Sequence, residues 1–112
     1  MAIGDVTPKK LFQGALSTAL LTRYTTPAGV RTQVTEIWIA NTNTATERKV
    51  TINAHGTAVA NTLHPALPVS ANGTVVLDNC KIVLNASEVL ALKQDVGADV
   101  VVTVYGIEEA IA

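Results

Sequence analysis

Residues 30–40 read VRTQVTEIWIA, and this stretch carries the clearest strand pattern in the chain. Ile37 and Ile39 lie two residues apart, as expected where a strand turns one face to a core. Between Val34 and Ile37 the apolar spacing is three residues, so the alternation slips. The slip predicts a β-bulge near residues 35–36, where one extra residue kinks the strand.

Further along the chain, residues 48–55 (RKVTINAH) alternate in the same way, and Val, Ile and Thr make up about a third of the sequence. Stiff β-branched side chains favour pleated strands. Shorter apolar runs follow at residues 75–77, 82–84, 89–92 and 100–107, separated by turn signals rich in Asn and Gly. The pattern predicts an all-β, antiparallel sandwich. Its clearest core positions are Ile37, Ile39, Val50, Ile52, Val102 and Val104.

Two segments fit a helix as well as a strand. Residues 7–20 place a proline at a first helical position and continue with apolar residues at helical spacing. Gly14 interrupts that spacing, and residues 21–26 (LTRYTT) are strand-like, which favours a strand. Residues 88–94 are short and lie between turn signals, so a strand is favoured there too.

Length and composition limit the classes of protein to consider. A chain of 112 residues has the size of one domain. Its net charge of −1 gives no basic footprint for nucleic acid. No apolar stretch is long enough to cross a membrane, and the N-terminus does not resemble a signal peptide, so we expect a soluble chain made in a cytoplasm. Cys80 is the single cysteine, cannot form an intramolecular disulfide, and is expected to be a buried apolar residue.

No catalytic, cofactor-binding or metal-binding residues are predicted. His55 and His64 are expected to be solvated loop residues, because a zinc site needs three or four ligands at closer spacing. The nine acidic residues are read as surface charges, and no nucleophile motif or phosphate loop occurs. Trp38 is expected in the core rather than in a stacking platform. The chain is therefore expected not to be an enzyme and to need no cofactor.

Several strand and turn motifs together resemble a known family. They are YTTPAG at residues 24–29, IWIANT at 37–42, SANGT at 70–74 and VTVYGIEE at 102–109. Chains with these motifs are similar to the small β-sandwich virion proteins of tailed bacteriophages, which include head-decoration and tail-associated components. The resemblance implies a jelly-roll-like or related Greek-key sandwich, self-association and a place on the virion, and it carries over no functional residue.

The function expected from this resemblance is that of a virion structural protein, most simply a homotrimeric subunit that decorates and cements the capsid surface. The expected partners are other copies of the chain and the major capsid protein or other virion proteins, with no nucleic acid and no membrane. Residues 1–9 are expected to form an extended N-terminal arm and residues 10–112 one sandwich domain. Within the arm, Ile3, Val6 and Pro8 are the candidate interface residues. The alternatives are a tail or neck component and a carbohydrate- or receptor-binding module.

Overall fold

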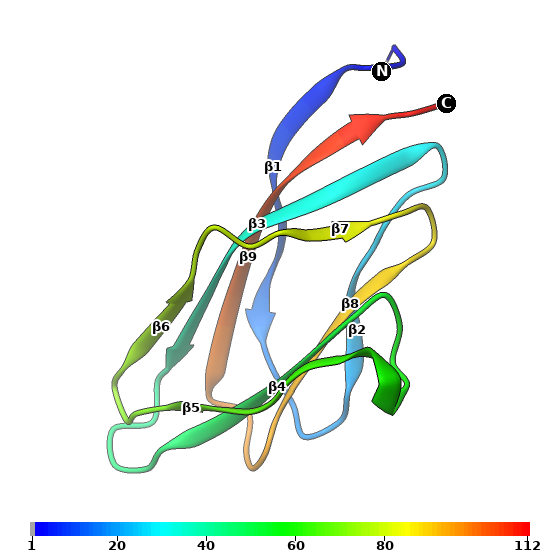
Figure 1. Cartoon of the computed structure of the whole chain (residues 1–112). Coiled ribbons are helices and arrows are strands. Elements are labelled where there is room, and N and C mark those ends of the chain that lie inside the picture. Colours follow the sequence, from blue (N-terminus) through cyan, green and yellow to red (C-terminus); the bar gives the residue numbers. More distant parts are fainter. Residues whose placement is uncertain (1) are drawn as a thin grey trace.

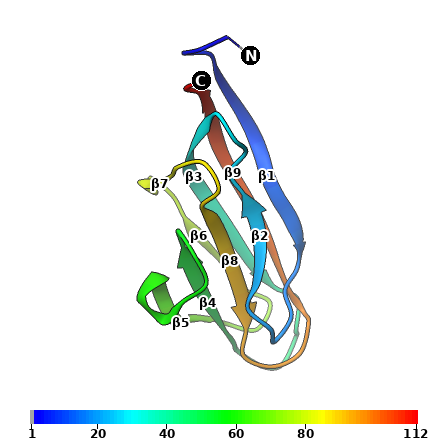
Figure 2. The same ribbon diagram turned by 90° about the vertical axis from the view of Figure 1, so that its right-hand side faces the viewer.

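The computed structural model describes residues 2–112 and shows two antiparallel sheets packed face to face (Figure 1). The sandwich is elongated, 48 × 25 × 19 Å, and both chain ends lie at the same end of it (Figure 2). Its elements are β1 (Val6–Ala15), β2 (Leu21–Thr25), β3 (Val30–Asn41), β4 (Arg48–Ala54), a turn of 3-10 helix η1 (Val59–Asn61), β5 (Thr62–Val69), β6 (Thr74–Leu77), β7 (Ile82–Leu84), β8 (Val89–Gln94) and β9 (Val100–Ala110).

Strand pairing gives the sandwich the winding of a jelly roll. One sheet has the order β1-β9-β3-β6, with β7 also pairing with β3, and the other has the order β2-β8-β4-β5. The first strands therefore pair in turn with the last: β1 with β9, β2 with β8, β3 with β6 and β7, and β4 with β5. A long hairpin wound into two sheets in this way is a jelly roll. The predicted antiparallel, jelly-roll-like sandwich is confirmed.

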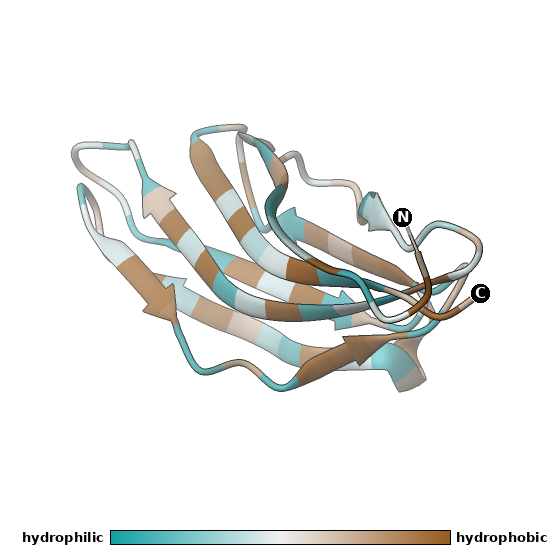
Figure 3. Cartoon of the chain, turned by 90° about the horizontal axis from the view of Figure 1, so that it is seen from above, coloured by the Kyte–Doolittle hydropathy of each residue, from teal (hydrophilic) through white to brown (hydrophobic). Residues whose placement is uncertain are grey.

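The core lies between the two sheets and is built from the alternating positions of the strands. All six residues predicted to face it are fully buried: Ile37, Ile39, Val50, Ile52, Val102 and Val104. Along the strands, apolar residues alternate with polar ones (Figure 3). Burying one apolar face of each sheet is the main source of stability for a sandwich of this kind.

The bulge predicted in β3 is present. The pairing of β3 with β9 shifts register between Val34 and Glu36, so Thr35 is the extra residue. This shift lets Val34 and Ile37, three residues apart, both reach the core with no exposed surface. A second shift, between Lys10 and Phe12 of β1, lies across the same sheet.

The two ambiguous segments are strands. Residues 6–15 and 21–25 form β1 and β2, and residues 89–94 form β8. Turn residues with positive φ include Asn72 (56°), Asn79 (51°), Ser87 (71°) and Gly97 (80°), which lie in the breaks between the predicted strands, and His55 (75°), which follows β4. In the break at residues 85–87 the left-handed position is taken by Ser87.

Strand β5 was not predicted from the sequence. It carries Pro65 and Pro68, which lack a backbone donor, and it is the outermost strand of its sheet. Proline is tolerated in a sheet at such an edge, where its missing N–H faces no neighbour. His64 therefore lies in a strand, and the expectation of a loop histidine at this position was wrong.

The N-terminal residues are tied to the sandwich. Strand β1 begins at Val6 and pairs with Glu109 of β9, so residues 6–9 of the expected arm lie within the sheet. Ahead of them, the Gly4 amide donates to the Ala110 carbonyl at 2.7 Å, and the Ala110 amide donates to the Asp5 carbonyl at 3.0 Å. Met1 lies outside the described residues. Attachment of this segment to a neighbouring chain stays a prediction.

Candidate interaction surfaces

The outer face of the β1-β9-β3-β6 sheet carries exposed aromatic and aliphatic side chains. Trp38 is 43% exposed, Tyr105 is 41% exposed and Val76 is 38% exposed. The core position expected for Trp38 was wrong, because Ile37 and Ile39 on either side of it take the inward positions of β3. The chain thus presents its only tryptophan to solvent.

Strand register sets the order of side chains across this outer face. Trp38 pairs with Val76 on one side and Thr103 on the other, and Gln13 follows on β1. The neighbouring row toward the termini runs Lys10, Tyr105, Glu36. Next come Pro8, Ile107, Gln33 and Val83, and then Val6, Glu109 and Arg31. Rows of paired residues on one face are close enough for direct contact.

Two of the three candidate interface residues belong to this face. Val6 is 56% exposed and lines a shallow hollow of about 230 Å³ together with Arg31, Gln33, Val83, Ile107 and Glu109. Pro8 pairs with Ile107. The third, Ile3, is 75% exposed and lies in the turn before β1. The structure therefore brings Val6 and Pro8 together with apolar residues of β9 and β7 that were not predicted to belong to an interface.

Charges of both signs lie on the same face. Arg31 and Glu109 form an exposed ion pair of 2.7 Å. Lys10 Nζ donates to Gln13 Oε1 at 3.1 Å, and Glu36 Oε2 accepts a 3.2 Å hydrogen bond from Trp38 Nε1. Within residues 2–112, neither Lys10 nor Glu36 takes part in an ion pair. These two opposite charges flank Tyr105 from the two neighbouring strands.

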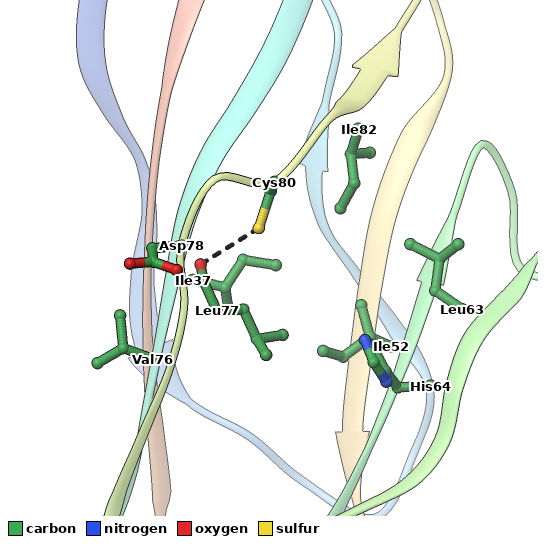
Figure 4. Close-up of a pocket in the computed structure, with 9 residues that line it drawn as sticks. All are labelled: Ile37, Ile52, Leu63, His64, Val76, Leu77, Asp78, Cys80 and Ile82. Atoms are coloured by element: carbon green, nitrogen blue, oxygen red, sulfur yellow. Dashed lines mark hydrogen bonds between the residues drawn. The ribbon is translucent and has the colours of Figure 1, made fainter.

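A second feature is a pocket of about 400 Å³ at the open edge of the sandwich, between β5 and the β6–β7 edge (Figure 4). Its lining is mostly aliphatic, and its polar members are His64, Asp78 and Cys80. Cys80 Sγ donates to the Leu77 carbonyl at 3.2 Å, and burial, followed by the charge of Asp78, raises the pKa of the thiol. Cys80 is half-buried against the core rather than fully buried.

The ionisable groups of the pocket do not make a metal site. Among the described residues there is no group of three or more His, Cys, Asp or Glu that could hold a metal ion. His55 lies elsewhere, with its Nδ1 3.2 Å from Glu88 Oε1. The Asn85 amide donates to the same carboxylate, and this bond, followed by that to His55, lowers the pKa of Glu88.

One acidic residue expected at the surface is instead buried. Glu108 is 7% exposed and accepts a 2.6 Å hydrogen bond from Tyr24 Oη, which also bonds Thr32 Oγ1 at 2.7 Å. Lys9 Nζ lies 3.3 Å from the Glu108 carboxylate. Burial, followed by the bond to Glu108, raises the pKa of Tyr24 to about 12. Each partner is satisfied within the fold, so this cluster is a structural one.

A second acidic residue is also held by partners within the fold. Asp99 receives hydrogen bonds from Arg48 at 3.0 Å, from Asn43 at 3.0 Å and from Gln94 at 2.8 Å. These bonds hold the pKa of the Asp99 carboxyl well below its usual range. Gln94 is fully buried and also accepts a bond from the Val100 amide at 3.0 Å. The cluster fixes the loops at the end of the sandwich opposite the termini (Figure 1).

None of the helices among the described residues is long and apolar enough to span a membrane.

No protein-family model matches the sequence, and no curated protein matches it. Similarity is found among solved structures. One similar structure is that of Bacillus endospore appendages, which are described as a novel family of disulfide-linked pili. The match has a TM-score of 0.58 and 10% sequence identity, and it covers 99% of this chain and 93% of the appendage chain. This likeness shows a shared fold.

A second solved structure is that of infectious bursal disease virus, Gx strain. It has a TM-score of 0.42 and 13% identity, and the match covers 96% of this chain and 37% of the viral one. At these values the viral structure adds nothing to the assignment of the fold.

Proposed function

We propose that this chain is a non-catalytic structural protein of a tailed-bacteriophage virion, a self-associating subunit that decorates and cements the capsid surface. The observation that carries the proposal is the outer sheet face with exposed Trp38, Tyr105 and Val76. Exposed apolar patches of this kind mark interaction sites. The resemblance of the strand and turn motifs to phage virion proteins supplies the biological setting.

Cementing requires only differential binding. A subunit that binds the assembled shell and not the dissociated capsid protein stabilises the shell by mass action, by about 2.7 kcal/mol per site at a free concentration of 100 times Kd. Copies of the chain, in the trimer that the resemblance implies, contribute several contacts at once. In the proposal the terminal end of the sandwich, with Ile3 exposed in its turn, contacts the major capsid protein.

Covalent linkage is not part of the proposal. The appendages that share the fold are described as disulfide-linked pili. This chain has Cys80 alone, and a single cysteine can join subunits only in pairs. Cys80 also has a raised pKa, which leaves less of the reactive thiolate at neutral pH. Assembly through non-covalent surfaces fits these residues better.

Two other functions compete with capsid decoration. A tail or neck component would contact a different virion protein. A carbohydrate- or receptor-binding module would need a concave site with aromatic and polar groups. The pocket at the β5 edge has no aromatic lining residue, and its polar groups are limited to His64, Asp78 and Cys80. A role in the virion is therefore preferred to carbohydrate or receptor binding.

Co-sedimentation with phage particles tests the proposal. Purified chain is mixed with tailed-phage heads assembled without accessory proteins, and with purified tails, and each mixture is spun through a sucrose cushion. Decoration predicts saturable binding to heads and raised thermal stability of the shell. Binding to tails alone moves the protein to the tail or neck, and binding to a glycan array without binding to either particle overturns the virion role.

A matched truncation locates the contact with the shell. Deleting residues 2–5 removes Ile3 and leaves β1 intact from Val6, whereas deleting residues 2–9 also removes strand pairs with β9. The shorter deletion is expected to leave far-ultraviolet circular dichroism unchanged while weakening attachment to heads. Ile3→Ser is the point variant that tests the same contact.

A further inference from the structure

We propose that the outer face of the β1-β9-β3-β6 sheet packs against the same face of a second copy, with a two-fold axis running along β9. The inference rests on the proposed self-association and names the surface that carries it. A two-fold contact joins copies in pairs. Trimers formed through another surface would then be joined face to face into hexamers.

The charges of the central row determine this orientation. Lys10 on β1 and Glu36 on β3 flank Tyr105 on β9, one on each side. A two-fold axis along β9 exchanges the β1 side of one copy with the β3 side of the other. Lys10 then faces Glu36 of the second copy, and the symmetry makes the pair twice. Complementary charges of this kind fix register and exclude other arrangements.

An axis running across the strands through Tyr105 gives the opposite result. It would set Lys10 against Lys10 and Glu36 against Glu36 of the second copy. Like charges brought together in an interface are costly. Lys10 and Glu36 also have no ion-pair partner within the described chain, so both are available for the contact.

Apolar side chains lie on both sides of the central row and along the axis. Tyr105, Ile107 and Val101 lie on the outer side of β9, where each would meet its own counterpart. Glu109 lies on the same side of β9 and would also meet its counterpart, but its charge is already paired with Arg31 of its own chain. Trp38 lies on β3 and would cover the β1 side of the second copy at Gln13. Exposed Trp and Tyr side chains near the centre of a contact are the residues that contribute most to binding.

The face is large enough for a stable contact. With four strand positions and the 11-residue length of β9, the face spans about 700 Å² at the usual strand spacing and rise. A standard interface buries about 800 Å² on each partner. Two sheets of this twist also pack with their strands aligned within about 30°, as an axis along β9 requires.

Other occupants fit the face less well. It carries both signs of charge, from Lys10 and Arg31 on one hand and Glu36 and Glu109 on the other, so it lacks the basic character that nucleic acid needs. A lipid surface would have to desolvate these four charges. A second copy supplies the opposite charge at each central position.

A charge-exchange series tests the surface. Lys10→Glu and Glu36→Lys are each expected to raise the dissociation constant at least about tenfold, as measured by sedimentation velocity, because each brings like charges together twice. The double variant Lys10→Glu with Glu36→Lys restores the pairs in reversed polarity and is expected to recover most of the affinity. Lys49→Glu and Glu47→Lys are the matched controls, since both lie exposed outside this face.

Site-specific cross-linking gives an independent measurement. Thr103 lies on β9, near the proposed axis, and packed sheets lie about 10 Å apart. Thr103→Cys with a short bis-maleimide is therefore expected to yield covalent dimers, whereas Lys49→Cys is not. Cys80 is common to both variants and serves as the background. Circular dichroism confirms that each variant is folded.

The outcomes separate this inference from the proposed function. A wild-type protein that associates in twos or sixes, responds to both single reversals and recovers in the double variant supports the face. If the protein associates only as a trimer, or if the single charge reversals leave its mass unchanged, the proposed surface is wrong and self-association through another surface remains. A wild-type protein that stays monomeric overturns both.

Discussion

Replacing Ile39 with alanine should destabilise the fold by about 3–4 kcal/mol. Ile39 is fully buried between the sheets. Alanine removes three carbons from the core, worth about 0.8 kcal/mol each in transfer free energy. The cavity left behind adds to this loss, and such changes cost about 2–5 kcal/mol in all.

Urea unfolding followed by far-ultraviolet circular dichroism measures the effect. With a slope of about 1.5 kcal/mol per molar urea, a loss of 3 kcal/mol lowers the midpoint by about 2 M. Self-association stabilises the folded state by mass action. Wild type and variant are therefore compared at one low protein concentration.

Ile3→Ala is the matched control, because the same atoms are removed from a side chain that is 75% exposed. Its free energy of unfolding should stay within about 0.5 kcal/mol of the wild-type value, as for most surface substitutions. An Ile39→Ala midpoint equal to that of wild type would show that Ile39 does not face the core, and the assignment of inner and outer faces would fail with it.

Four further results are expected. Ile52→Ala should cost about 2–5 kcal/mol in the same assay, and a cost below 1 kcal/mol would contradict its place in the core. Because the pKa of Asp99 is lowered in the fold, its stabilising effect is present above about pH 4 and is lost as pH falls further. Asp99→Asn should therefore lose stability less steeply than wild type on acidification, and parallel curves would refute the Arg48–Asp99 contact as its source. The pKa of Tyr24 is raised from 10.0 to about 12, so its contribution is present below pH 10 and is lost as pH rises toward 12, whereas Tyr24→Phe should show a flatter decline. Iodide should quench Trp38 fluorescence in dilute protein and quench it less as the protein concentration rises. Quenching that is the same at all protein concentrations would place Trp38 outside the contact.

Strand β3 shows what local sequence pattern can predict. Alternation of Ile37 and Ile39 gave the buried face, and the slip after Val34 gave the bulge, because both depend on neighbours in the chain. The same alternation also predicts an outward Trp38. That signal was outweighed by the tendency of large aromatic residues to be buried, which is an average over proteins and not a property of this strand.

Strand β5 and the partners of Glu108 and Asp99 could not be predicted from local pattern. Pro65 and Pro68 read as turn residues unless the strand is known to be at an edge. Buried Glu108 accepts a hydrogen bond from Tyr24, which lies 84 residues earlier. Asp99 is fixed by Arg48, 51 residues earlier. Contacts over such separations follow from the topology and are not visible in a stretch of sequence.

The outer face required strand register as well. Lys10, Tyr105 and Glu36 form one row only because β1, β9 and β3 pair as they do, with shifts at both bulges. A change of register by one residue would turn each of these side chains to the other face. Val6 and Pro8 were predicted as interface residues because they lie in an apolar stretch of the sequence. Only the pairing of β1 with β9 shows which residues lie beside them on the outer face.

Both proposals require this chain to associate with copies of itself. Multi-angle light scattering of the intact wild-type protein, across a hundredfold range of concentration, tests this requirement most directly. Self-association predicts a mass that is a multiple of the 11.7 kDa chain and that decreases on dilution as the oligomer dissociates. A mass of one chain at every concentration would contradict it.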